Sequence, residues 1–428
     1  MEPTVEKGED LLSKLPSDVL VSILEKLELR EAIRAGVLSS RWQCLPKQLP
    51  RFALDIDDFL PGGGDEEYDD HDNGEDDVAP HDDVLSEAGN KMVDVAAALL
   101  ASRDAGDVRQ VASLAVSFHL RHSYYMSLGR LLDDAVASGK VRAVELQITS
   151  KMDIIVGIQD GESTERALLH GYGRRFRTLL DACPAAFGAL TKLTIQMVKL
   201  DKLDLDDILL TCTRLEDLTL KYCVPGPGVL WQVRHARLTD MKISLCGIRG
   251  INLGWLPRLE RFAFKGWYFA PSHDLVSFGH VPRLSAATLS QDSDETLKLS
   301  RILPNTALKD LRLNFRGSNL TDHDCGVAMK SVPWKLDTCF KHYSLTRVTI
   351  IGFYNTEEMI VAHIRYLVEA AVNLKEIYMR ENATDCAICG HAEPQAGSRF
   401  PRTDEEKDTF TKRITNGRSG TFKTYIQS

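Results

Sequence analysis

The organisation of this chain follows from residues 11–46, which read LLSKLPSDVLVSILEKLELREAIRAGVLSSRWQCLP. Pro16 suits the first turn of a helix, where its missing N–H and fixed φ cost nothing, so a helix is predicted to begin there or at Leu15. Four large aliphatic side chains then recur at i, i+3, i+4 and i+7 and share one helical face. They are Leu20, Ile23, Leu24 and Leu27. Two shorter helical segments follow, and Ser39 or Ser40 is predicted to cap the last of them.

These helices are too small to be stable by themselves. Three short helices within about 40 residues bury too little apolar surface to offset the entropy of ordering them. The segment therefore needs a partner, which is either the rest of this chain or a second protein.

The order of residues in this segment resembles an F-box of the variety common among plant proteins. The resemblance rests on Leu15-Pro16, Val19-Leu20, Ile23-Leu24, Leu29-Arg30, Val37-Leu38-Ser39 and Arg41-Trp42. It implies a three-helix module over residues 11–54 that docks onto a Skp-type adaptor and, through the adaptor, onto a cullin-based ubiquitin ligase. The residues expected to contact the adaptor or to support the module are Leu15, Pro16, Val19, Leu20, Ile23, Leu24, Leu27, Ile33, Val37, Leu38, Arg41 and Trp42.

The composition is that of an ordinary globular protein whose acidic residues are concentrated in one tract. The chain has 428 residues, of which 43% are apolar and 26% charged, and its net charge is -9. Residues 55–83 hold 14 acidic residues and no Lys or Arg, which leaves 52 Lys and Arg against 47 acidic residues elsewhere. Such a tract repels itself and has little to bury, so residues 55–85 are predicted to form a disordered linker.

The cysteines and the lengths of the apolar runs limit the cellular compartments in which this chain is expected. Nine cysteines are scattered along the chain, unlike the dense spacing of a secreted disulfide scaffold. The first residues show no basic region followed by an apolar core, so no secretory signal is predicted. No run approaches the roughly 18 apolar residues that a membrane helix requires. We therefore expect reduced thiols, no membrane partner, and a location in the nucleus, the cytoplasm or both.

A six-residue leucine pattern recurs through most of the remaining chain. It begins at Leu190, Leu215, Leu238, Leu259, Leu284, Leu308, Leu345 and Leu374. Positions 4 and 6 of each segment alternate on a short strand and point inward, and one such unit must stack on the next to bury them. The array resembles leucine-rich repeats of the irregular kind that follow F-boxes. The predicted fold is therefore α/β, with the three-helix F-box followed by a solenoid over residues 86–352, a curved and mostly parallel sheet with helices and loops outside.

Two further features come with this resemblance. At position 9 the family places Asn or Cys to satisfy backbone groups in the turn, and Cys223 and Cys246 agree with that pattern. The other repeats depart from it, which predicts irregular turns; their residues at this position are Val198, Trp267, Asp292, Arg316 and Phe353. After residue 352, a helical run, the strand-like LKEIYM, a cysteine-containing loop and FPRTDEEKDTFTKRI resemble the C-terminal region called FBD. Residues 353–428 are therefore predicted to form an FBD-like region.

No residue cluster predicts catalysis or a cofactor. Cys386 and Cys389 with His391 supply at most three ligands where structural zinc needs four, so a plain loop is favoured and no metal is predicted. His119 and His122 lie near two tyrosines, but His119 falls on a predicted strand and is interpreted as structural. No nucleophile elbow, Walker loop or complete dinucleotide fingerprint occurs. The chain is predicted not to be an enzyme, with an unrecognised catalytic site as an alternative.

The residues between the inward ones on each strand face the open side of the predicted array. Both of their rows are polar and somewhat basic, which favours a target protein with acidic groups. Without an aromatic ladder, this face is a poor platform for nucleic acid. The candidate target-binding residues are Thr194, Lys221, Lys242, Lys265, Arg312, Asn314, Tyr378 and Arg380.

These features predict a substrate-recruiting subunit of an SCF-type ubiquitin ligase. The helices would hold the Skp-type adaptor, and the repeat array would present an unidentified target protein to an enzyme carried elsewhere in the complex. The alternative is a repeat-based interaction scaffold that acts outside any ubiquitin ligase, with the N-terminal helices capping the array.

Overall fold

The chain folds into two compact units, Met1–Thr194 and Ile195–Ser428. The computed structural model describes residues 15–61, 82–103, 110–121, 123–149, 162–200, 204–225, 229–248, 250–265, 276–290, 307–314, 341–351, 358–380, 401–415 and 422–427. The sequence-based interpretations of His122 and of Cys386, Cys389 and His391 lie outside these residues. No helix among the described residues combines the length and the apolar character needed to cross a membrane.

The first unit begins with three short helices, as the leucine spacing predicts. They are α1 (Ser17–Leu24), α2 (Leu29–Arg34) and α3 (Ser40–Cys44), with 3₁₀ turns η2 (Ala35–Leu38) and η3 (Pro46–Gln48) between and after them. Ser39 caps α3, because its Oγ accepts a hydrogen bond from the Trp42 N–H at 3.4 Å. Pro16 is the extended N-cap residue of α1, with φ -56° and ψ 151°, so the helix begins slightly later than predicted.

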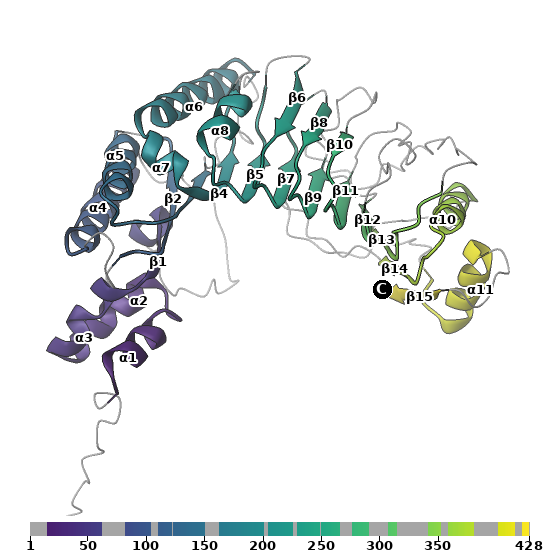
Figure 1. Ribbon diagram of the computed structural model, residues 1–428, viewed down its shortest axis with the longest axis horizontal. Helices are drawn as coiled ribbons and strands as arrows, with labels where there is room; N and C mark the ends of the chain where they lie inside the picture. Colours follow the sequence, from purple (N-terminus) through teal and green to yellow (C-terminus); the bar gives the residue numbers. More distant parts are fainter. Residues whose placement is uncertain are drawn as a thin grey trace, which may run out of the picture. The chain divides into compact units, whose positions relative to one another are not determined.

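A parallel sheet follows the helices in the first unit. Its strands run in the order β1 (Arg51–Asp55), β2 (Ser113–His119), β3 (Val144–Thr149) and β4 (Leu190–Gln196). Between them lie α4 (Asp82–Ala101), α5 (Tyr124–Ala137), α6 (Glu162–Ala182) and α7 (Pro184–Gly188), as Figure 1 shows. Parallel neighbours need such crossover segments because a tight turn cannot join them.

Regular structure continues on both sides of the predicted boundary at residue 54. Strand β1, assigned above to the helical module, pairs with β2 in register Phe52 with Leu114. The 3₁₀ turn η4 (Ile56–Phe59) falls within the predicted linker, and so does the first turn of α4. The 3₁₀ turn forms in the acidic tract because its first residue, Ile56, is buried. Its side chain is 1% exposed and anchors the beginning of the tract. Residues 62–81 of that tract lie outside the described residues.

The second unit contains a longer parallel sheet built from the leucine segments. Its strands run in the order β5 (Asp217–Lys221), β7 (Asp240–Ser244), β9 (Arg261–Lys265), β11 (Ala286–Ser290), β12 (Asp310–Asn314), β13 (Arg347–Ile351), β14 (Glu376–Arg380) and β15 (Lys423–Gln427). Each of the first seven begins at the third position of a leucine segment. The last two lie beyond the predicted boundary at residue 352, because the LKEIYM segment keeps the same pattern and pairs with β13.

A second, three-stranded parallel sheet lies in the connections between the early repeats of this unit. Its order is β10 (Val276–His280), β8 (Gly250–Trp255) and β6 (Leu230–Arg234). The described residues of the unit also form α8 (Asp204–Thr211), α10 (Glu358–Ala370) and α11 (Asp404–Thr415). Arg365 on α10 joins the last two, since its Nε donates to the Arg413 carbonyl at 2.6 Å.

The interior of the repeats follows the leucine pattern. The side chains at positions 4 and 6 are buried in every segment of the second unit, including the small Ala287, which is 2% exposed. After β4, β5 and β7 the backbone turns through the left-handed region at Met197 (φ 57°), Tyr222 (φ 51°) and Leu245 (φ 51°). The same turn at the same place in successive repeats keeps the stacked backbones in register.

Two cysteines hold these turns, as predicted for position 9. The Cys223 Sγ donates to the Ile195 carbonyl at 3.6 Å, and the Cys246 Sγ donates to the Leu220 carbonyl at 3.6 Å. Each thiol therefore reaches back to the preceding repeat and satisfies a buried carbonyl there.

Candidate functional site

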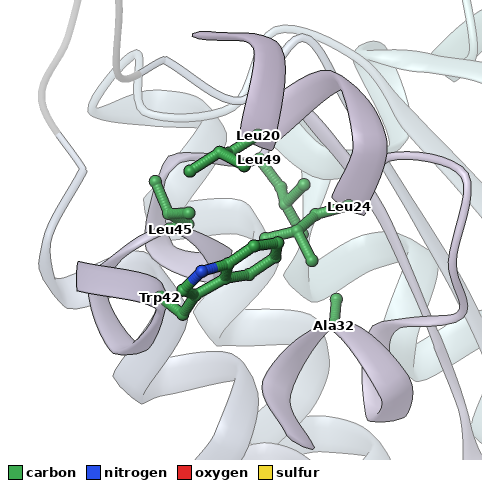
Figure 2. Packing of buried hydrophobic residues seen from close by; sticks show 6 residues of the cluster. All are labelled: Leu20, Leu24, Ala32, Trp42, Leu45 and Leu49. Atoms are coloured by element: carbon green, nitrogen blue, oxygen red, sulfur yellow. The ribbon is translucent and has the colours of Figure 1, made fainter. Parts of the chain in front are cut away.

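The N-terminal module has an apolar core made by all of its helices. Figure 2 shows six side chains pointing toward one another: Leu20, Leu24, Ala32, Trp42, Leu45 and Leu49. Three of the predicted adaptor-or-support residues, Leu20, Leu24 and Trp42, thus belong to this core, with exposures of 0%, 0% and 5%. Their physical role is to support the module.

Other predicted residues of the module remain in contact with solvent. They are Val19 (40% exposed), Ile23 (38%), Leu27 (41%), Ile33 (44%), Val37 (90%) and Leu38 (68%). We call them the exposed apolar residues. Among the described residues these make up half of the strongly exposed large apolar side chains, and all six come from one short stretch. Single apolar residues on a surface are ordinary, whereas such a concentration marks an interaction site.

The remaining predicted residues of the module lie at the junction of α1 and α3. Arg41 on α3 donates through Nη2 to the Leu15 carbonyl at 2.6 Å and to the Ser17 Oγ at 3.1 Å. Leu15 is half-buried against the core, and Pro16 is exposed. Arg41 therefore fixes the start of α1 relative to α3, a structural contact that the sequence pattern did not reveal.

The second candidate surface is the open face of the sheet in the second unit. We define the open face as positions 3, 5 and 7 of each repeat, which alternate with the buried positions 4 and 6. Position 3 carries a ladder of ion pairs between neighbouring strands. Arg261 on β9 pairs with Asp240 on β7 through both carboxylate oxygens. The Nη2 of Arg347 on β13 lies 2.9 Å from the Oε2 of Glu376 on β14.

The carboxylates in this ladder affect the arginines that they contact. The carboxylate of Asp240 raises the pKa of Arg261, and that of Glu376 raises the pKa of Arg347. The Arg347–Glu376 pair is partly in solvent on both sides, so it fixes rotamers of the open face more than it stabilises the fold. In the Arg261–Asp240 pair the carboxylate is buried, so loss of Arg261 would leave a buried charge without its cation.

The predicted target-binding residues are placed unequally on the repeats. Lys221, Lys242, Arg312 and Arg380 are exposed, and Lys265, Asn314 and Tyr378 are half-buried. Thr194 on β4 is the exception, because its short side chain is only 8% exposed. It is therefore corrected from a candidate contact to a buried residue.

A hollow of about 260 Å³ opens on this face over β7, β9, β11 and β12. Ala263 and Thr288 lie at position 5 of the two middle strands and carry short side chains where longer ones stand on either side. The lining residues are Asp240, Met241, Lys242, Arg261, Phe262, Ala263, Ala286, Ala287, Thr288, Asp310 and Arg312. The hollow is thus a direct result of small residues at neighbouring repeat positions.

One feature of the open face was missed by the sequence reasoning. Tyr425 on β15 stacks on Tyr378 with ring centroids 4.7 Å apart and an interplanar angle of 12°. The guanidinium carbon of Arg347 lies 5.8 Å from the Tyr378 ring centroid. The alternating sequence Lys-Thr-Tyr-Ile-Gln at 423–427 was the available signal, but it lacks the leading leucine of the other segments.

The buried thiols and histidine have structural roles rather than catalytic ones. Burial raises the pKa of Cys183 to about 11 and that of Cys212 to about 12, so both thiols are protonated and poor nucleophiles at neutral pH. His119 is 4% exposed. Its Nδ1 lies 2.8 Å from the Thr149 carbonyl on β3. The part of the chain that the structure describes contains no group of three or more His, Cys, Asp or Glu able to hold a metal.

Comparison with known proteins gives two domain matches. Residues 12–53 match the F-box domain, and residues 159–309 match the family described as "FBD-associated F-box protein At5g56370, LRR repeats". The chain thus carries an F-box domain and a leucine-rich-repeat region of the kind found in FBD-associated F-box proteins. Both matches support a role in protein interaction.

Individual relatives match over a short length. The FBD-associated F-box protein At5g22730 of Arabidopsis thaliana is 44% identical over 52 residues, which are 12% of this chain and 11% of that protein. The F-box/FBD/LRR-repeat protein At5g18770 of the same plant is 45% identical over 53 residues, again 12% of this chain and 11% of that protein. The chain therefore aligns with about a tenth of the length of these relatives.

Proposed function

We propose that this chain is the substrate-recruiting F-box subunit of an SCF-type ubiquitin ligase. Its N-terminal helices bind a Skp-type adaptor, and the adaptor connects it to a cullin. Its repeat array holds a target protein. The observation that carries the proposal is the concentration of exposed apolar residues on a module whose core is already complete.

The size of this apolar surface suits a protein partner. The exposed fractions of the six residues amount to about three whole side chains. Burying one whole aliphatic side chain is worth about 1.5–3 kcal/mol, so a partner that covers them all gains roughly 5–9 kcal/mol. Association itself costs about 4–15 kcal/mol, so the partner must cover the whole set and add polar contacts around it.

The contribution of this subunit to catalysis is proximity. Holding a target beside a transferring enzyme raises the effective concentration of the two reacting groups, and this requires no reactive side chain here. The raised thiol pKa values described above support a non-catalytic role.

The proposed location is the nucleus, the cytoplasm or both. All five cysteines of the described residues are free thiols, and four of them are buried. Free thiols are typical of the reducing compartments in which ubiquitin ligases act.

The test is capture of the full-length chain by a purified Skp-type adaptor. Val37→Asp and Leu38→Asp place a charge in the most exposed part of the set, and each is expected to abolish capture without disturbing the core. Leu210→Asp is the matched control, because Leu210 on α8 is a 74% exposed leucine outside the module. Capture of both module variants at the wild-type level would remove the ligase assignment and favour an interaction scaffold that acts outside any ligase.

A further inference from the structure

The open face of the second unit has a fixed order of side chains at position 5. The strand registers place these residues side by side from β5 to β15. They are Thr219, Lys242, Ala263, Thr288, Arg312, Thr349, Tyr378 and Tyr425. This row therefore presents two short residues between two cations and, further along, a pair of tyrosines.

The size of the hollow over the short residues decides what kind of group can enter it. Its volume is about 260 Å³. Pockets for free small molecules are typically about 300–1,000 Å³ and enclose most of the ligand. The hollow is below that range and lies on an open sheet face, so it suits one side chain of a larger partner.

The charges around the hollow favour an acidic side chain. Arg261 and Asp240 neutralise each other through a two-point contact. Asp310 lies 4.0 Å from Arg312 and 3.8 Å from Arg347, and Arg347 is itself paired with Glu376 at 2.9 Å. Among the described residues, Lys242 has no hydrogen-bond or ion-pair partner and is exposed on the opposite side of the hollow. The lining holds three cations against two carboxylates, so one positive charge is left over. It lies on Lys242, which stands across Ala263 and Thr288 from Arg312.

The tyrosine pair offers a different kind of contact further along the same row. Tyr378 and Tyr425 are both half-buried and stacked, so their rings are already held in place before a partner arrives. Arg347 lies against the Tyr378 ring and adds a cation to the platform. Tyrosine and arginine dominate the energetic centres of protein interfaces, because large rigid surfaces lose little entropy on binding. An aromatic side chain of the partner fits such a platform by stacking.

We infer that the open face recognises an extended segment of the target that carries an acidic residue and an aromatic residue about six positions apart. The acidic side chain enters the hollow between Lys242 and Arg312, and the aromatic side chain stacks on Tyr378 and Tyr425. The centre of the hollow and the tyrosine pair are four strand steps apart in the sheet. At about 4.8 Å per step this is about 19 Å, which an extended peptide spans in roughly six residues. The inference rests on the proposed function only in that the repeat array binds the target.

The experiment measures binding of fluorescent peptides to the purified full-length chain by polarisation. Peptides in a Ser/Thr background carry one Glu and one Trp separated by two, six or ten positions. We expect the six-residue separation to bind most tightly, and replacement of Glu by Gln in that peptide to weaken it about tenfold, as expected for a lost charged hydrogen bond. Equal affinity at all three separations, or with Gln in place of Glu, would overturn the inference.

Variants of the chain assign each contact. Lys242→Ala and Arg312→Ala are expected to weaken the Glu peptide about tenfold and to leave the Gln peptide unchanged. Ala263→Leu fills the hollow and should weaken binding of the Glu peptide without any change in the charge of the chain. Lys192→Ala on β4 is the matched control for general electrostatics, since Lys192 is an exposed lysine of the first unit. An equal loss in this control would show non-specific attraction and contradict the inference.

Two further comparisons complete the test. Tyr425→Ala should weaken the Trp-containing peptides and leave a peptide without Trp unchanged. A phosphoserine peptide that binds far more tightly than the Glu peptide would overturn the carboxylate as the recognised group.

Adaptor capture is a separate measurement, so a chain that binds adaptor but no peptide contradicts only this inference. A chain that binds the peptide but no adaptor contradicts only the ligase assignment.

Discussion

Trp42 is expected to be the residue on which the N-terminal module depends most. Its indole is 5% exposed and packs in the six-residue core. Truncating a buried tryptophan to alanine costs about 3–5 kcal/mol. A core in a module this small rarely supplies more than about 3–5 kcal/mol in total. Trp42→Ala therefore removes nearly all of the stability of the module, and we expect the three helices to unfold locally while the rest of the first unit stays folded.

Hydrogen exchange on the full-length chain measures this effect directly. The reporting amides are those of Leu20, Ala32 and Gln43, which donate to the carbonyls of Pro16, Glu28 and Ser39 at 3.1, 2.9 and 3.1 Å. Their protection should fall to that of an unfolded segment in Trp42→Ala, since local opening governs exchange. Amides of β2 and β3 should keep their protection.

The matched comparison is Val37→Asp, which changes a side chain that is 90% exposed. This variant should keep the amide protection of the module and still lose the adaptor. Wild-type protection in Trp42→Ala would refute the reasoning, because it would mean that the core around Trp42 contributes little. Loss of protection in Val37→Asp would refute it as well, because the exposed apolar residues would then belong to the core.

Three other predictions concern the second unit. Arg261→Met should lower the free energy of unfolding by about 1–3 kcal/mol in urea denaturation, because it leaves the carboxylate of Asp240, whose side chain is 7% exposed, without its cation; an unchanged midpoint would contradict this. Burial lowers the pKa of both His235 and His342, and the Nδ1 of each accepts the N–H of the leucine that opens a repeat, at 3.1 and 3.0 Å. The unfolded chain therefore binds protons more readily than the folded one, so stability should fall as the pH drops below about 6.5 toward the lowered folded pKa. The double variant His235→Asn and His342→Asn keeps a hydrogen-bond acceptor at each position but has no titrating ring. If the thermal midpoint of this variant falls with acid as steeply as that of wild type, the two histidines are not the cause of the pH dependence. Burial also raises the pKa of Cys246, so alkylation mapped by mass spectrometry should modify this thiol no faster than the unit unfolds.

The helices of the module were predictable from sequence, but the roles of their leucines were not. Leu20, Ile23 and Leu24 share one helical stripe, yet Leu20 and Leu24 are fully buried while Ile23 is 38% exposed. An amphipathic stripe is wide enough to face both a core and a partner. Periodicity gives the direction of the stripe and cannot divide it between the two. A substitution such as Leu20→Asp, attractive from sequence alone, would therefore test folding instead of adaptor binding.

The repeats were predictable where one leucine pattern determines both the position of the strand and the side chains that it buries. That logic placed β4, β5, β7, β9, β11, β12, β13 and β14 and the thiols of Cys223 and Cys246. It missed β15, whose segment lacks the leading leucine, and the sheet of β6, β8 and β10, whose strands lie in the irregular return segments. The missed strands do not repeat the leucine segment, and strand pairing by itself leaves little local signal in the sequence. The tyrosine pair escaped for the same reason, since Tyr425 meets Tyr378 only through strand pairing.

The two proposed surfaces depend on different forces, and this bears on how the chain could work. The exposed apolar residues of the module gain affinity from burial, which salt does not screen. The proposed contact of Lys242 and Arg312 acts through charge, and the screening length falls from about 8 Å at physiological ionic strength to about 3 Å at 1 M salt, so exposed ion pairs weaken as salt is added. Adaptor binding should therefore persist over a range of salt in which target binding weakens. Under the proposed function, the chain would keep its adaptor in salt that releases the target, because the two contacts are made by separate parts of the chain.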